Sequence, residues 1–141
     1  RQTQETRQNR LIIKMGDNLD ITNLKESALP RALFARMKKE ILGNRYELSL
    51  SFVSLKEIKK LSRAHKGDDT HTNVLSFPLS ENLGELVVCV ETVKKECLEY
   101  GRGCRQHLKY IVIHGMLHLA HHVHGSRMEV AEKRLFSKFS S

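Results

Sequence analysis

Two histidines in an apolar segment have the spacing of metal ligands. His114 and His118 lie four residues apart in the segment I-V-I-H-G-M-L-H-L. Four residues make about one helical turn, so on a helix both side chains project from the same face and can bind one ion. Neutral imidazoles are good ligands for zinc. The pair therefore predicts a zinc ion bound on one face of a helix.

A third ligand is needed to complete such a site. His124 follows His118 by six residues, and a continuous helix would carry it too far along the axis to reach the same ion. If the chain turns after about Ala120, the pattern H-x-x-x-H-x-x-x-x-x-H matches the zinc signature of metzincin proteases. If the helix runs on to Gly125 instead, His121 competes with His124. Three histidines leave the fourth zinc position open for water or substrate, as in catalytic sites.

The segment departs from a protease signature at two positions. Gly115 stands where H-E-x-x-H enzymes carry the glutamate that acts as general base. His121 stands where metzincins turn on glycine, and histidine adopts that left-handed conformation at a greater cost. Both departures disfavour peptidase activity. The remaining histidines of interest are expected to be surface or loop residues: His65, His71 and His107.

The same segment and a second motif resemble the YbeY family of endoribonucleases. Residues 114–119 together with His124 are similar to the family pattern H-G-x-L-H-L-x-G-Y-D-H. Upstream, T-N-V-L-S-F-P at residues 72–78 is similar to the family's T-D/N-V-L-S-F-P, and G-E-L-V-V at 84–88 resembles its strand beginning G-D-I. The order and spacing of these motifs agree from about Asn18 to Phe139.

The resemblance implies a single α+β domain with a small mixed sheet and one zinc ion. It implies that His114, His118 and His124 are the metal ligands. It also implies cleavage of single-stranded RNA in ribosomal RNA maturation and ribosome quality control. The ribosome or ribosomal proteins are then expected partners, and the cytoplasm is the expected location.

Two departures from the family pattern fall on the implied active site. Lys66, in L-S-R-A-H-K-G, stands where the family usually carries an arginine in L-N-x-x-Y-R-G. His121, His122 and Val123 replace the family's Gly-Tyr-Asp. Val123 cannot offer the hydrogen bonds of an aspartate near the metal, so support for the ligands must come from another residue.

Lys66 and His114 are the candidate catalytic residues. Cleavage of a phosphodiester needs an activated nucleophile and stabilisation of the negative charge on the phosphoryl oxygens, and zinc can supply both. The nucleophile could be water or the RNA 2′-OH, and the residues do not distinguish the two. We expect the Lys66 ammonium to be the second cation across the cleft. Lysine lacks the bidentate fork of arginine, which Arg63 could partly replace.

The overall charge is consistent with a polyanionic partner. Lys plus Arg number 24 against 16 Asp plus Glu, which gives a net charge of +8 and a pI near 9.6. Basic residues dominate the segments Lys56 to Lys66 and Lys94 to Lys109, so salt-dependent binding to RNA is plausible. With five Phe, three Tyr and no Trp, extended stacking of RNA bases is not expected. No apolar run is long enough to span a membrane.

Two other functions remain open from these residues. The chain could be a non-catalytic factor that binds RNA or the ribosome, with a structural zinc ion and an H-H-V-H segment that marks lost activity. It could also be a zinc hydrolase of another substrate, such as a metallopeptidase, which Gly115 disfavours.

Hydrophobic periodicity divides the chain into strands and helices. We expect the α+β class, with a mixed four-stranded sheet, about five helices and the zinc site at the C-terminal end of a central helix. A capping box at Ser54 predicts a short helix that ends near Leu61, followed by a polar loop over 63–72 that carries Lys66. The predicted strands span 18–24, 46–53, 74–79 and 85–90. The other predicted helices span 30–42, 92–100, 105–120 and 126–139.

The chain length predicts one domain, residues 15–141, preceded by a basic tail at residues 1–14. The tail has no apolar stretch of the kind found in secretory signals. Cys89, Cys97 and Cys104 are odd in number and form no C-x-x-C pair. We expect them to be buried or free thiols, as in a reducing compartment.

Overall fold

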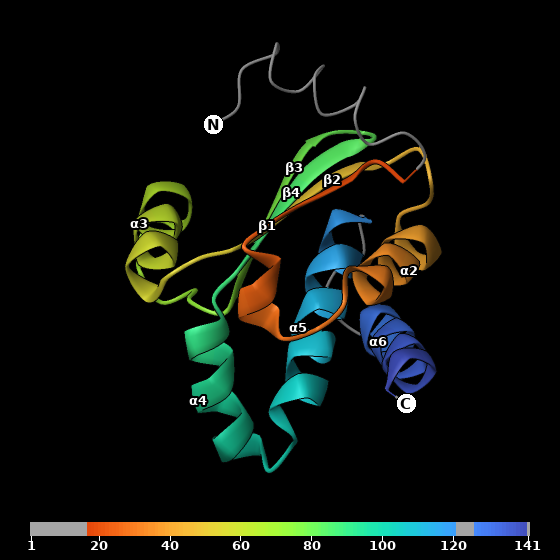
Figure 1. The fold of residues 1–141 in the computed structure, drawn as a ribbon. Helices are drawn as coiled ribbons and strands as arrows, with labels where there is room; N and C mark the ends of the chain where they lie inside the picture. Colours follow the sequence, from red (N-terminus) through yellow and green to blue (C-terminus); the bar gives the residue numbers. More distant parts are fainter. Residues whose placement is uncertain (1–16, 121–125, 141) are drawn as a thin grey trace.

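The computed structural model describes residues 17–120 and 126–140 (Figure 1). The predicted tail at 1–14 and residues 121–124 lie outside these ranges, so the domain limits and the roles of His121 and His124 stay predictions. In chain order, the elements are β1 (Leu19–Thr22), the 3-10 helix η1 (Leu24–Ser27), α2 (Arg31–Ile41), β2 (Glu47–Phe52), α3 (Leu55–Lys66), β3 (Val74–Ser80), β4 (Leu83–Val88), α4 (Val90–Tyr100), α5 (Cys104–Leu119) and α6 (Ser126–Phe139).

The four strands form one mixed sheet in the order β1-β2-β4-β3. β1, β2 and β4 are parallel, and β3 pairs antiparallel with β4 at the edge of the sheet. The alternation that predicted β2 is present, because every second residue of this strand is buried. The predicted mixed sheet with about five helices is therefore confirmed, and η1 is an addition to it.

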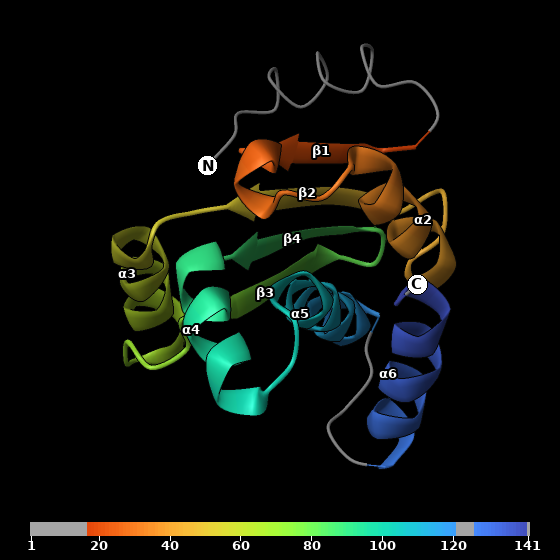
Figure 2. The same cartoon turned by 60° about the horizontal axis from the view of Figure 1, so that its bottom comes forward.

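α5 is the central helix, and it contacts α2, α4, α6, β3 and β4 (Figures 1 and 2). Its residues Ile113 and Met116 are fully buried in the larger core, together with Leu50 of β2 and Leu86 of β4. α5 needs such cover because it is apolar on most of its surface.

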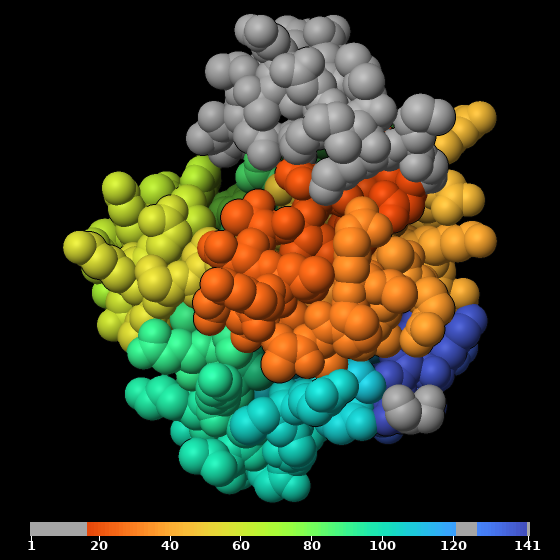
Figure 3. All heavy atoms as spheres, in the orientation of Figure 1, coloured from red at the N-terminus to blue at the C-terminus, as the bar shows by residue number. Residues whose placement is uncertain are grey.

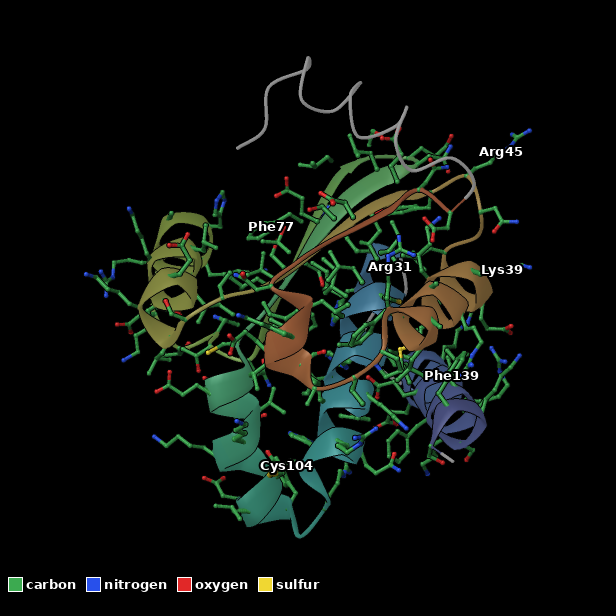
Figure 4. All side chains as sticks on the ribbon, viewed as in Figure 1. Arg31, Lys39, Arg45, Phe77, Cys104 and Phe139 are labelled. Atoms are coloured by element: carbon green, nitrogen blue, oxygen red, sulfur yellow. A yellow bond between two sulfur atoms is a disulfide. The ribbon has the colours of Figure 1, made fainter. Side chains whose placement is uncertain are left out.

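α3 packs on a second, smaller cluster formed by Ile58, Leu75, Val87 and Cys89. Phe77 of β3 also packs there, on the side of the sheet that faces α3 (Figure 4). The two faces of β3 and β4 thus bury different residues, since neighbouring side chains in a strand point to opposite faces.

α3 is longer than the sequence predicts, and this moves Lys66 from a loop to a helix. The predicted capping box is present, because the Ser54 side chain accepts a hydrogen bond from the Glu57 backbone N–H at 3.1 Å. The helix continues past Leu61 and ends at Lys66, and Gly67, with a φ of 83°, provides a left-handed cap. Polar residues beyond Leu61 conceal this extension in the sequence, although lysine and arginine are good helix formers.

Cys97 and Cys104 form a disulfide between the end of α4 and the start of α5, with Cα atoms 5.2 Å apart (Figure 4). This corrects the expectation that all three cysteines are thiols. The turn at residues 101–103 folds the start of α5 back against α4, a proximity that sequence spacing does not reveal. Cys89 is a buried free thiol, as expected.

A polar contact fixes the start of β1 to α2. The Arg31 guanidinium donates to both carboxylate oxygens of Asp17, at 2.6 and 3.1 Å, and to the Leu19 carbonyl at 2.7 Å. Figure 4 shows Arg31 between α2 and the sheet. The guanidinium holds the pKa of Asp17 below its ordinary value.

α3 and α4 lie side by side at the end of the sheet where β2 and β4 finish (Figures 2 and 3). The two basic segments are therefore neighbours on one side of the molecule. They comprise Lys56 to Lys66 and the start of Lys94 to Lys109. Among the described helices, none combines the length and apolar character needed to cross a lipid bilayer.

Candidate active site

The side chains of His114 and His118 converge on the C-terminal half of α5. Their Nε2 atoms are 3.1 Å apart, and their rings are 4.7 Å apart between centroids. Both residues are partly exposed, although most of their neighbours on α5 are buried. The predicted placement of this pair on one helical face is confirmed.

Glu132 of α6 contacts the other nitrogen of His114, through its Oε2 and the ring Nδ1. A carboxylate accepts hydrogen bonds, so in the matching tautomer Nδ1 donates to Glu132 and Nε2 presents its lone pair. The hydroxyl of Tyr110 donates to Glu132 Oε1 at 3.3 Å. Burial and the Glu132 carboxylate raise the pKa of Tyr110, so its hydroxyl stays protonated at neutral pH.

The histidine pair fits a zinc ion. With Zn–N bonds of about 2.0–2.1 Å in a tetrahedral site, two ligand nitrogens lie about 3.3 Å apart. The observed 3.1 Å is close to this separation. The Nδ1 contact to a carboxylate is also typical of zinc-bound histidine. Within residues 17–120 and 126–140, no third ligand joins the pair, and His124 lies outside these ranges.

Gly115 brings α5 close to the sheet. A Cβ atom at this position would lie 2.4 Å from Leu86 Cδ1 and 3.0 Å from Val74 Cγ2. Beside it, the hydroxyl of Ser76 on β3 donates to the Gly115 carbonyl at 3.0 Å. Position 115 therefore faces the strands, and the structure leaves no room there for the glutamate of a metalloprotease.

A cavity of about 700 Å³ lies next to the histidine pair. Lys66, from the last turn of α3, lines this cavity together with His114 and His118. The structure thus brings together the described members of the predicted catalytic and metal sets. Arg63 does not line the cavity and pairs with Asp69 at 2.9 Å instead.

His107 differs from the sequence expectation, because it is 2% exposed and forms part of a polar cluster. Its Nε2 lies 2.9 Å from Glu96 Oε1, and the Asn73 amide donates to both Glu96 oxygens at 3.3 and 3.1 Å. His65 and His71 do lie at the surface, although His71 also lines the cavity.

Sequence reasoning missed Glu132, although the sequence contains a signal for it. Met128, Glu132, Leu135 and Phe139 repeat at helical spacing, and all four are buried. A carboxylate on such an apolar stripe needs a polar partner. Glu132 gives His114 the polar partner that Val123 was predicted to be unable to offer.

Comparison with known proteins gives one family. The family model described as endoribonuclease YbeY matches residues 12–140. A relative named endoribonuclease YbeY from Caldanaerobacter subterraneus is 32% identical over 86% of this chain and 87% of its own length. Another with the same name, from Halalkalibacterium halodurans, is 34% identical over 89% of each chain.

A solved structure is also similar. The solution structure of a Thermotoga maritima protein matches with a TM-score of 0.65 and 30% sequence identity. The match covers 86% of this chain and 88% of the other. Similarity over most of both chains extends the likeness from short motifs to the whole fold.

Proposed function

The chain belongs to the endoribonuclease YbeY family, and on this premise we propose that it is a zinc-dependent endoribonuclease that cuts single-stranded RNA. One observation carries the proposal: the convergent Nε2 atoms of His114 and His118 lie beside a cavity that Lys66 also lines. The proposed role is the maturation and quality control of ribosomal RNA in the cytoplasm.

In this proposal, His114, His118 and His124 hold one zinc ion. When bound, zinc polarises a phosphoryl oxygen and lowers the pKa of a bound water. Glu132 keeps the proton of His114 on Nδ1 and so keeps Nε2 available as a ligand. Tyr110 in turn orients Glu132 by a hydrogen bond to its second oxygen.

Lys66 holds the phosphate backbone in the cavity. Its side chain lines the cavity together with the histidine pair. Lys66 binds a phosphoryl oxygen and stabilises the negative charge that develops on it during cleavage. This role is the same whether water or the RNA 2′-OH attacks the phosphorus.

Ribosomal RNA is the proposed substrate, with ribosomal proteins as its neighbours. The adjacent basic segments on α3, α4 and the start of α5 supply sequence-independent attraction for an RNA backbone. The tight packing at Gly115 argues against the metallopeptidase alternative, since the helix has no room for that base.

Comparing wild type with His114→Ala tests the proposal. Purified wild-type protein should contain about one zinc ion per chain and cut a labelled single-stranded RNA. The variant should lose both properties while its circular dichroism spectrum stays unchanged. RNA binding without cutting by the zinc-loaded wild type would favour the non-catalytic factor instead.

The third ligand is tested separately by zinc content. We expect His124→Ala to lose zinc and His121→Ala to retain it. Loss of zinc only in His121→Ala would overturn the assignment of His124.

A further inference from the structure

The cavity beside the histidine pair extends along α5 to a wall built by α4, α5 and the turn between them. We call Glu96, Tyr100, Arg102 and Tyr110 the α4–α5 wall, and all four line the cavity. His107, behind this wall, lies two helical turns before His114, or about 10 Å along the axis. The wall therefore adjoins the histidine pair through Tyr110, whose ring centroid lies 6.2 Å from that of His114.

The wall offers flat surfaces to the cavity. Tyr100 is 63% exposed, and its ring lies 5.4 Å from that of the buried His107. The Arg102 guanidinium carbon lies 4.7 Å from the centre of the Tyr110 ring and 5.5 Å from that of Phe136. Aromatic rings and guanidinium planes of this kind stack on unpaired RNA bases.

The wall also contains one carboxylate in a cavity whose fixed charges are otherwise positive. Glu96 is held by Asn73 and His107, and its side chain remains 23% exposed. A carboxylate repels phosphate but accepts hydrogen bonds from the N–H groups of a base. Each carboxylate oxygen has more than one acceptor site, so Glu96 can accept a further donor from the cavity.

We propose that the α4–α5 wall is a nucleobase subsite that takes one unpaired base next to the cleaved phosphate, with guanine preferred over uracil. The base stacks on Tyr100, and its Watson–Crick edge donates to Glu96. Guanine offers adjacent N1–H and N2–H donors on that edge, whereas uracil offers a single N–H. Arg102 adds donors for the guanine acceptors O6 and N7. The choice of an RNA ligand rests on the proposed function.

Nucleoside monophosphates test the subsite without any cleavage, because they contain no phosphodiester bond. The affinities of zinc-loaded protein for guanosine 5′-monophosphate and uridine 5′-monophosphate would be measured by calorimetry. We expect the guanosine nucleotide to bind about tenfold more tightly. Equal affinities would overturn the preference for guanine.

Variants of the wall separate stacking from edge recognition. Tyr100→Ala should weaken binding of both nucleotides about tenfold, whereas Tyr100→Phe should bind like wild type. Glu96→Gln should remove the preference for guanosine. The exposed neighbours on α4 provide matched controls, and Leu98→Ala and Glu99→Gln should leave both affinities unchanged.

The outcomes distinguish this subsite from the proposed function. Protein that cuts single-stranded RNA but binds both nucleotides equally, with Tyr100→Ala like wild type, would overturn the subsite alone. Protein that prefers the guanosine nucleotide through Tyr100 and Glu96 but never cuts RNA would support the subsite and contradict the nuclease.

Discussion

The candidate site depends on a few side chains whose atoms are fixed by their neighbours. His114 has one ring nitrogen directed at His118 and the other at Glu132. Glu132 is itself buried and bonded to Tyr110. This chain of contacts favours one tautomer of His114, so Glu132 is a positioning residue for the proposed metal ligand.

Glu132→Gln should weaken zinc binding about tenfold, because a neutral amide makes Nε2 of His114 a poorer ligand. Competition with a zinc-binding dye measures this affinity directly. Glu129→Gln changes an exposed carboxylate on the same helix and should bind zinc like wild type. Unchanged zinc affinity in Glu132→Gln would show that the contact does not support the ligand.

Lys66→Ala should lower the rate of RNA cleavage about 10- to 100-fold, because one cation facing the phosphate is lost. Lys66→Arg should retain or raise the rate, since arginine keeps the charge and can donate two parallel hydrogen bonds to one phosphate. Lys60→Ala, at an exposed position on the same helix, is the matched control. If Lys66→Ala cuts RNA as fast as wild type, Lys66 has no role in catalysis.

Among the elements, the close approach of α5 to β3 and β4 positions the site. Gly115 permits this approach, and the Ser76 hydrogen bond lies at the same point. Gly84 of β4 similarly leaves space for the ring of Tyr46, whose hydroxyl oxygen would lie 2.2 Å from a Cβ there. Glycines in both family motifs thus serve packing between elements.

Gly115→Ala should destabilise the fold by about 1–3 kcal/mol, because the added methyl group overpacks fully buried Leu86. Helix propensity alone predicts the opposite, a gain of about 1 kcal/mol. The free energy of unfolding, measured in urea, shows whether Gly115→Ala stabilises or destabilises the fold. In a double-mutant cycle, Leu86→Ala should cost less in the Gly115→Ala background than in wild type, and strict additivity would exclude this clash.

The pairing of Asp17 with Arg31 should make stability depend on acid pH. The guanidinium lowers the pKa of Asp17, so the stabilisation is complete above the unfolded-state pKa and is lost as pH falls through the folded-state pKa. Asp17→Asn should cost less than about 1 kcal/mol at pH 7, since both side chains are well exposed.

This difference between wild type and Asp17→Asn should disappear at acid pH. Urea unfolding between pH 7 and pH 2 measures it, with Glu81→Gln in an exposed turn as control. A difference that persists at the acid end would show that charge pairing is not its cause.

Hydrophobic periodicity, with a capping box for α3, predicted the four strands and five α-helices of the described residues, because each element buries one regular face. It placed Lys66 in a loop, since the last turn of α3 is polar and extends past the apolar pattern. Glu132 and His107 were missed as partners because their contacts join different helices. The disulfide from Cys97 to Cys104 was missed for the same reason.

At the scale of the whole molecule, one cavity is lined both by the residues of the proposed cleavage site and by those of the proposed base subsite. The histidine pair and Lys66 lie at one part of it, and the α4–α5 wall lines another. Basic residues are frequent on α3, on α4 and at the start of α5, which favours an extended polyanion over a small neutral ligand. The molecule is therefore suited to the proposed function, in which it holds an RNA strand while the proposed zinc site faces one phosphate.

The most direct test of the central claim measures cleavage of a labelled single-stranded RNA by the purified wild-type protein, before and after a chelator removes its metal. We predict that cleavage stops when the metal content falls to zero and returns when zinc is added back. Cleavage at an undiminished rate by protein shown to be free of metal would contradict a zinc-dependent nuclease.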